Sequence, residues 1–304
     1  SNREGCRARF DTVKGIEVMA SLKEIKGRIA SVQSTLKITS AMKMVSSAKL
    51  HKVQGAAASF AEYESRLSAM VATLRAVSEV QSPLMAEHTA PKRAILVALA
   101  SDTSLCGGFN NSAIKTLHEA VNRLTEAGFE QVEVIPIGEK MAAAVAKSGY
   151  AVCGEFATSI GDYDYARVAE LTEWLMEEYV TEHIDCVEVA YHHFHSMGRQ
   201  VARVDRVLPL ASEQLQTGEQ TAEVEYIFEP STEELLASLV PYAVKTQMYE
   251  IVLDNTTSEH AARTVAMQTA SDNANDLLEE LRLTYNKRRQ QAITDELADI
   301  TSHE

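Results

Sequence analysis

The two ends of this sequence contain almost no helix-breaking residues. The chain of 304 residues has 6 prolines and 13 glycines, yet residues 20–80 contain no proline and only Gly27 and Gly55, and residues 242–304 contain neither type. Uninterrupted, each stretch would form a helix of roughly 90 Å at ~1.5 Å per residue. A helix this much longer than an ordinary globular one indicates a coiled coil, a membrane span or a repeat. Two such helices at opposite ends of one chain can pair antiparallel.

Cysteines and long apolar runs are also scarce. The 4 cysteines are far apart and form no CxxC pair, which favours reduced cytosolic thiols over a disulfide framework or a zinc site. The longest apolar run covers residues 94–100 and is far too short to cross a bilayer, so we predict no membrane span. Residues 1–18 lack the apolar core of a signal peptide. We interpret Met19 as the natural start and residues 1–19 as a leader or added segment.

The charge balance is acidic overall but basic near the beginning of the chain. A net charge of −14 argues against broad binding to nucleic acid, which depends on clustered lysine and arginine. Residues 20–55 nevertheless carry a single acidic residue, Glu24, among the basic residues Lys23, Lys26, Arg28, Lys37, Lys43, Lys49 and Lys52. A basic helix is either a solvated face or a surface that seeks an acidic partner. We favour the acidic partner.

Both end regions carry a coiled-coil seam. In the first region the seam residues alternate at intervals of three and four: Leu22, Ile25, Ile29, Val32, Leu36 and Thr39. In the second region they are Ala274, Leu278, Leu281, Tyr285 and Ala292, followed after a skip by Ile293, Leu297 and Ile300. This spacing predicts left-handed coiled-coil helices over 20–80 and 231–302. The first ends where Ser78, Ser82 and Pro83 cluster, and the second opens with a capping box at Ser231 and Glu234 and kinks or restarts at Pro241.

The region between these helices alternates between strands and helices. Apolar and alternating runs predict strands over 94–100, 132–138, 186–194 and 201–208. Helical spacing predicts helices over 112–127, 140–147 and 165–180. This order indicates an α/β domain over 92–229, so the predicted fold class is α/β with a long antiparallel coiled coil.

The α/β region contains no recognisable active-site motif. The loop 101–110 carries two adjacent glycines, but GxGxxG, GxxxxGK[ST] and GxSxG are all absent. The loop could cradle a phosphate at a helix N-terminus, although a tight strand-to-helix turn is the simpler interpretation. His192, His193 and His195 cluster without acidic or cysteine ligands nearby, and nothing marks Cys106 as reactive. We predict no catalytic residue, no metal site and no cofactor.

Three segments together identify a family resemblance. Residues 21–50 (SLKEIKGRIASVQSTLKITSAMKMVSSAKL) closely resemble the N-terminal helix of the γ subunits of F-type ATP synthases. Residues 259–300, notably EHAARTVAM and YNKRRQQAITDEL, resemble the C-terminal helix of the same family. The loop SDTSLCGGFN (101–110) is similar to the motif SDxGLCGxxN that opens the family's central domain, although Thr103 and Ser104 replace its usual Arg-Gly.

The resemblance implies a rotor subunit without catalysis of its own. In this family the terminal helices form an antiparallel coiled coil inside a ring of three α and three β subunits. The central domain is Rossmann-like, binds no nucleotide, and sits with the ε subunit on the membrane-embedded c-ring. Ion flow turns the ring and the γ subunit, which drives ATP synthesis at the β subunits; hydrolysis reverses the rotation. One copy serves each complex, peripheral to the bacterial inner membrane on its cytoplasmic side.

The resemblance also implies which residues contact the β subunits. The matching positions are Lys37, Met42, Arg263, Gln290 and Thr294. Gln290 and Thr294 are four apart on one helix face, within a polar interruption of the seam at 286–291. A static coiled-coil scaffold would favour apolar residues at that interruption, and an enzyme with helical dimerisation arms would need an active-site motif. We therefore favour a shaft whose contacts with the surrounding subunits change over a static scaffold or an enzyme.

Overall fold

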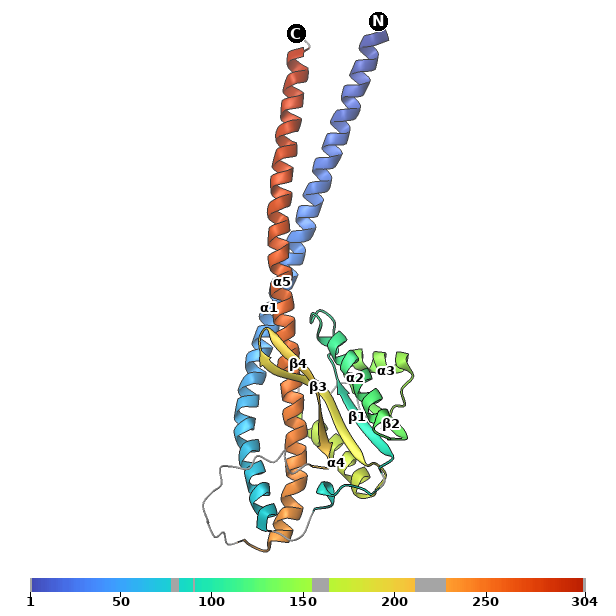
Figure 1. The fold of residues 1–304 in the computed structure, drawn as a ribbon. Coiled ribbons are helices and arrows are strands. Elements are labelled where there is room, and N and C mark those ends of the chain that lie inside the picture. Colours follow the sequence, from blue (N-terminus) through green and yellow to red (C-terminus); the bar gives the residue numbers. More distant parts are fainter. Residues whose placement is uncertain (1, 78–81, 90, 155–163, 211–227, 303–304) are drawn as a thin grey trace. The chain divides into compact units, whose positions relative to one another are not determined.

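Two long helices form the ends of the chain. The computed structural model describes residues 2–77, 82–89, 91–154, 164–210 and 228–302, with α1 at Asn2–Val77 and α5 at Thr232–Ser302 (Figure 1). The two long helices predicted from the lack of proline and glycine are confirmed, although α1 begins at Asn2, before the predicted start at residue 20. The predicted restart at Pro241 is wrong, because α5 continues through this proline. Val240 and Ala243 are buried on either side of it, and burial of an amphipathic face stabilises both turns.

The ends of these helices are only partly within the described residues. The predicted break at Ser78 lies outside them, whereas Ser82 precedes a 3₁₀ turn at Pro83–Met85. At the start of α5, the Glu234 backbone N–H donates to Ser231 Oγ at 3.2 Å. This bond is one half of the predicted capping box.

The chain divides into two compact units. One comprises Ser1–Val45 with Ala266–Glu304, and the other is Ser46–Val265. Each long helix contributes a segment to both units.

The first unit is an antiparallel helix pair. The Thr39 and Ser271 hydroxyl oxygens lie 2.8 Å apart and are buried, and Ala274 and Leu278 are buried beyond them. Towards the N- and C-terminal ends the two helices diverge (Figure 1). The seam residues of α5 become exposed in the same direction, with Leu297 58% exposed. The predicted pairing is confirmed, and the apolar seam extends beyond the part that the two helices bury.

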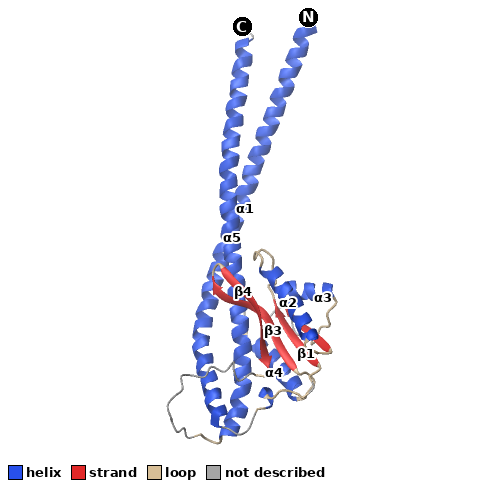
Figure 2. Ribbon diagram, viewed as in Figure 1, coloured by secondary structure: helices blue, strands red, loops and turns tan. Residues whose placement is uncertain are grey.

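The second unit contains a four-stranded mixed sheet of order β2-β1-β3-β4 (red in Figure 2). The pairs β1–β2 and β1–β3 are parallel, and β3–β4 is antiparallel. The strands are β1 (Arg93–Leu99), β2 (Gln131–Ile137), β3 (Cys186–Ser196) and β4 (Arg199–Leu208). The helices are α2 (Phe109–Glu126), α3 (Glu139–Ser148) and α4 (Tyr165–Val180). All seven elements lie within three residues of their predicted bounds.

Side chains of β1 alternate between two hydrophobic clusters. Ala94, Leu96 and Ala98 pack with residues of α2 and α3 on one face of the sheet. On the opposite face, Ile95 and Val97 pack with α4 and with parts of α1 and α5. Burial on both faces explains why the sequence of β1 is continuously apolar rather than alternating.

Candidate functional site

The loop 101–110 is held in shape by its own polar side chains. The Ser101 backbone N–H donates to Asn110 Oδ1 at 3.1 Å, and Ser101 Oγ donates to the Thr103 carbonyl at 2.6 Å. Asn110 Nδ2 contacts the buried Sγ of Cys106 at 3.2 Å. The chain reverses through Leu105 and Gly107, which both have positive φ. The loop therefore forms a tight turn between β1 and α2.

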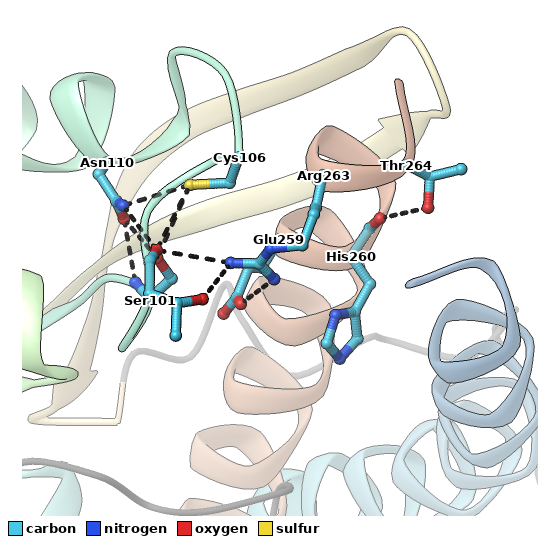
Figure 3. Close-up of polar contacts among 8 residues, drawn as sticks. Ser101, Cys106, Asn110, Glu259, His260, Arg263 and Thr264 are labelled. Atoms are coloured by element: carbon cyan, nitrogen blue, oxygen red, sulfur yellow. Dashed lines mark hydrogen bonds and ion pairs between the residues drawn. The ribbon is translucent and has the colours of Figure 1, made fainter. Parts of the chain in front are cut away.

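Arg263 joins this loop to α5. Its guanidinium donates to Glu259 Oε1 at 2.5 Å and to Thr103 Oγ1 at 2.9 Å (Figure 3). The side chains of Arg263 and Glu259 are only 9% and 18% exposed. Charge-assisted bonds that are shielded from water are stronger than surface pairs, so this contact braces the loop against the helix. Sequence reasoning placed Arg263 at a partner surface and did not identify Thr103 or Glu259 as its neighbours.

The other four predicted contact residues lie in the helix-pair unit. Lys37 is exposed and lines a groove of about 580 Å³ between α1 and α5, whose other lining residues are Gln33, Leu36, Asn275, Leu278, Glu279 and Arg282. Met42 is half-buried on α1. Gln290 and Thr294 are exposed, and Thr294 Oγ1 donates to the Gln290 carbonyl at 3.0 Å. The structure thus places a cation, a flexible apolar side chain and an exposed amide on this unit, and Arg263 on the other unit.

The histidine cluster of β3 is divided between two environments. The His192 ring is 2% exposed and stacks on Phe109 with 4.3 Å between ring centroids, and burial lowers the pKa of His192 to about 4. His193 Nδ1 instead bonds to Asp254 Oδ2 at 2.6 Å. Within the described ranges, no group of three or more His, Cys, Asp or Glu side chains is arranged to hold a metal ion. His192 and His193 therefore contact α2 and α5 respectively.

A polar cavity of about 320 Å³ lies between α1, α5 and the β3–β4 hairpin of the second unit. The Tyr191 hydroxyl donates to Asp205 at 2.7 Å and accepts from Arg203 Nε at 2.6 Å. Burial, together with the charges of Glu64 and Asp254, raises the pKa of Glu250. These groups make the cavity a polar region between the hairpin and the long helices.

Sequence reasoning missed a polar row on α5. The row consists of three residues that bond to β3: Asp254, Asn255 and Ser258. Two of them are buried, since Asn255 is 4% exposed and Ser258 is 0% exposed. The available signal was the run DNTTSEH at 254–260, which is polar where a core helix would be apolar. Buried polar side chains need partners, so such a run indicates specific hydrogen bonds.

Among the residues that the structure describes, no helix combines the length and the apolarity needed to cross a bilayer.

Comparison with known proteins identifies the family. The sequence model of the ATP synthase family described as "ATP synthase" matches residues 21–303. Among curated relatives, the ATP synthase gamma chain of Phocaeicola vulgatus is 46% identical, and the match covers 93% of this chain and 98% of that protein. The ATP synthase gamma chains of Bacteroides fragilis and Cytophaga hutchinsonii are 45% and 38% identical, over 93% of this chain and 98% and 97% of theirs.

Solved structures show the same fold at low sequence identity. A chain of the Euglena gracilis mitochondrial ATP synthase rotor aligns with a TM-score of 0.55 at 17% identity, covering 90% of this chain and 99% of that one. A chain of the Tetrahymena thermophila mitochondrial ATP synthase central stalk and c-ring aligns with a TM-score of 0.53 at 21% identity, covering 77% and 99%. Because the sequence relatives match almost from end to end, the chain belongs to the ATP synthase gamma-chain family.

Proposed function

We propose that this chain is the central rotor shaft of an F-type ATP synthase, coupling ion-driven rotation of a c-ring to ATP synthesis or hydrolysis at β subunits. The observation that carries the proposal is the match to gamma chains at up to 46% identity over 98% of their length. In this role the chain has no catalytic site and needs no cofactor. Its partners are the α3β3 hexamer, the ε subunit and the c-ring, with one copy per complex.

The physical basis of coupling is a difference in contact energy. A single asymmetric shaft cannot contact three equivalent β subunits equally, so each subunit is biased towards a different conformation. Such a bias requires that the shaft interact with a different free energy with each conformation of the β subunit. A contact that is equally tight in all conformations does not shift the equilibrium between them. The exposed apolar seam supports this role, because Ile293, Leu297 and Ile300 are 47%, 58% and 67% exposed in the free chain. A surrounding hexamer would cover them.

The proposed β contacts are Lys37, Met42, Arg263, Gln290 and Thr294. Exposed pairs contribute only ~0–1 kcal/mol each, so we expect Lys37 to act mainly through long-range attraction to acidic surfaces. Arg263 differs from the others because it is 7% exposed and already bonded to Glu259 and Thr103. To reach a β carboxylate, its guanidinium would exchange the Thr103 bond for the partner.

The proposed location is peripheral to the bacterial inner membrane, on the cytoplasmic side. The c-ring provides the membrane attachment in this arrangement.

Reconstitution with purified α and β subunits tests the proposal. ATP hydrolysis is measured with and without this chain, and the mass of the complex gives the copy number. We expect one copy per three αβ pairs and strongly raised hydrolysis. Failure to join, or joining in several copies, would contradict the shaft and favour a static scaffold.

A further inference from the structure

The later part of one edge of β3 is partnered by a helix rather than by a strand. Within the described residues, β1 pairs with β3 only from Cys186 to Ala190, whereas β4 accompanies β3 as far as Ser196. Beyond Ala190, the backbone groups on the β1 side of β3 therefore need other partners, because buried backbone donors and acceptors are rarely left unpaired.

Three side chains of α5 supply those partners. The Phe194 N–H donates to Asp254 Oδ1 at 2.8 Å, and the His192 N–H donates to Asn255 Oδ1 at 3.1 Å. Ser258 Oγ donates to the His192 carbonyl at 3.0 Å. Groups of residues two apart on a strand point to the same edge, so one helix face can meet all of them. We call Asp254, Asn255 and Ser258 the α5 key.

We propose that the α5 key prevents α5 from sliding or rolling on the sheet. The key thereby positions the helix so that torque is transmitted between the α/β sheet and α5. The inference rests on the proposed rotor function. Apolar packing is non-directional and tolerates small slides, whereas a hydrogen bond weakens steeply with distance and angle. A slide of one residue, ~1.5 Å along the axis, would lengthen and misalign all three bonds.

A second attachment lies further along α5. Arg263 bonds to Thr103 in the loop after β1. Arg263 lies nine residues beyond Asp254, which is roughly 13 Å along the helix axis. Two attachments separated along a helix resist tilting as well as sliding. The contact between His193 Nδ1 and Asp254 Oδ2, at 2.6 Å, adds to the first attachment.

The test compares a double variant of the key with a matched exposed control. Asp254→Ala/Asn255→Ala removes the two α5 acceptors of the Phe194 and His192 N–H groups. Asn273→Ala/Asp276→Ala removes the same residue types from exposed positions of the same helix. Asp254→Asn keeps an oxygen acceptor for Phe194 and serves as the conservative variant.

The first readout is hydrogen–deuterium exchange of the full chain over residues 191–195. We expect at least tenfold faster exchange in the double variant and wild-type exchange in the control. Unchanged exchange would overturn the assignment of the key to the β3 edge.

The second readout is ions transported per ATP hydrolysed, measured on the complete synthase in membrane vesicles. We expect the double variant to assemble and hydrolyse ATP but to lose at least half of this ratio, while Asp254→Asn and the control keep it. Faster exchange with a wild-type ratio would overturn the transmission role. If the double variant does not assemble, the smaller change Ser258→Ala, which deletes one oxygen, replaces it in both measurements. The same outcomes then support or overturn the proposal.

The two proposals fail separately. If the wild-type chain does not join α3β3, the rotor function is wrong, whereas the exchange result still reports on the key.

Discussion

Replacing Arg263 tests whether its brace to the loop 101–110 is energetically important. Arg263 and Glu259 are four apart on α5, and Arg66 and Glu62 have the same spacing on α1, with 2.6 Å between the paired atoms. The two pairs differ in exposure, since the Arg66 and Glu62 side chains are 76% and 70% exposed. The variants Arg263→Met and Arg66→Met therefore make the same chemical change in two environments.

The structure sets the expected magnitudes. Arg263→Met removes a charge-assisted bond worth about 1.5–3 kcal/mol and a bond to Thr103 worth about 1 kcal/mol, and it leaves Glu259 shielded without a partner. Methionine keeps much of the aliphatic packing, so we expect a loss of about 3 kcal/mol in the free energy of unfolding. Arg66→Met should cost less than about 0.5 kcal/mol, as exposed helix pairs do.

Urea unfolding of the full chain, followed by Trp174 fluorescence, measures both values. Trp174 is the only tryptophan and lies in the unit Ser46–Val265, which also contains both arginines. Adding Glu259→Gln to Arg263→Met should recover part of the loss, because it removes the stranded charge. Equal effects of the two arginine variants, within about 0.5 kcal/mol, would refute the claim that the brace is shielded and strong.

Three further predictions concern a buried histidine, a constrained glycine and a contact residue. His192 has a folded pKa of about 4, below an unfolded value near 6.5, so the unfolded state binds the proton more readily. Stability should be complete above pH 6.5 and fall by up to about 3 kcal/mol as the pH drops to 4, and urea unfolding of His192→Phe should not show this component. Gly138→Ala should cost more than about 3 kcal/mol and lower the soluble yield, because φ is +95° and the new Cβ would lie 2.2 Å from the Ala100 oxygen. Met42→Lys should lower ions transported per ATP in membrane vesicles while leaving assembly intact, because a cation would replace a half-buried apolar side chain at the proposed β contact.

Each of these has a control and a contradicting result. An unchanged pH profile in His192→Phe would show that other groups cause the acid sensitivity. Gly55→Ala, in a helix with nothing within 4 Å of the new Cβ, should be stabilising by about 0.5–1 kcal/mol, and a similar gain for Gly138→Ala would be incompatible with the structure. A normal transport ratio in Met42→Lys would argue against that contact.

Local patterns predicted most of the fold. The missing prolines and glycines indicated both long helices, and the continuous apolar run of β1 indicated a strand buried on both faces. The restart predicted at Pro241 does not occur, because local propensity does not include tertiary burial and the buried Val240 and Ala243 stabilise the turns around it. The extent of the helix pairing was equally beyond the sequence, since a seam predicts a partner but not whether that partner belongs to the same chain.

The candidate site was less accessible to sequence reasoning. Family resemblance indicated five contact positions, and four of them lie on the helix pair as exposed or half-buried residues. It did not reveal the bond from Arg263 to Thr103, which are 160 residues apart in sequence. The α5 key could not be predicted either, because its bonds also join residues that are far apart in sequence. Asn255 and Ser258 are polar residues in a buried position, and only the contact with the edge of β3 explains them.

Observing rotation of single complexes tests whether this chain turns inside the α3β3 hexamer. The α3β3 hexamer would be fixed to a surface, with a probe attached to this chain through Glu126→Cys at the exposed end of α2, after Cys6→Ser and Cys153→Ser. We expect the probe to rotate in one direction, and only while ATP is hydrolysed. A probe that stays fixed during continued hydrolysis would contradict the rotor function and leave this chain as a static scaffold.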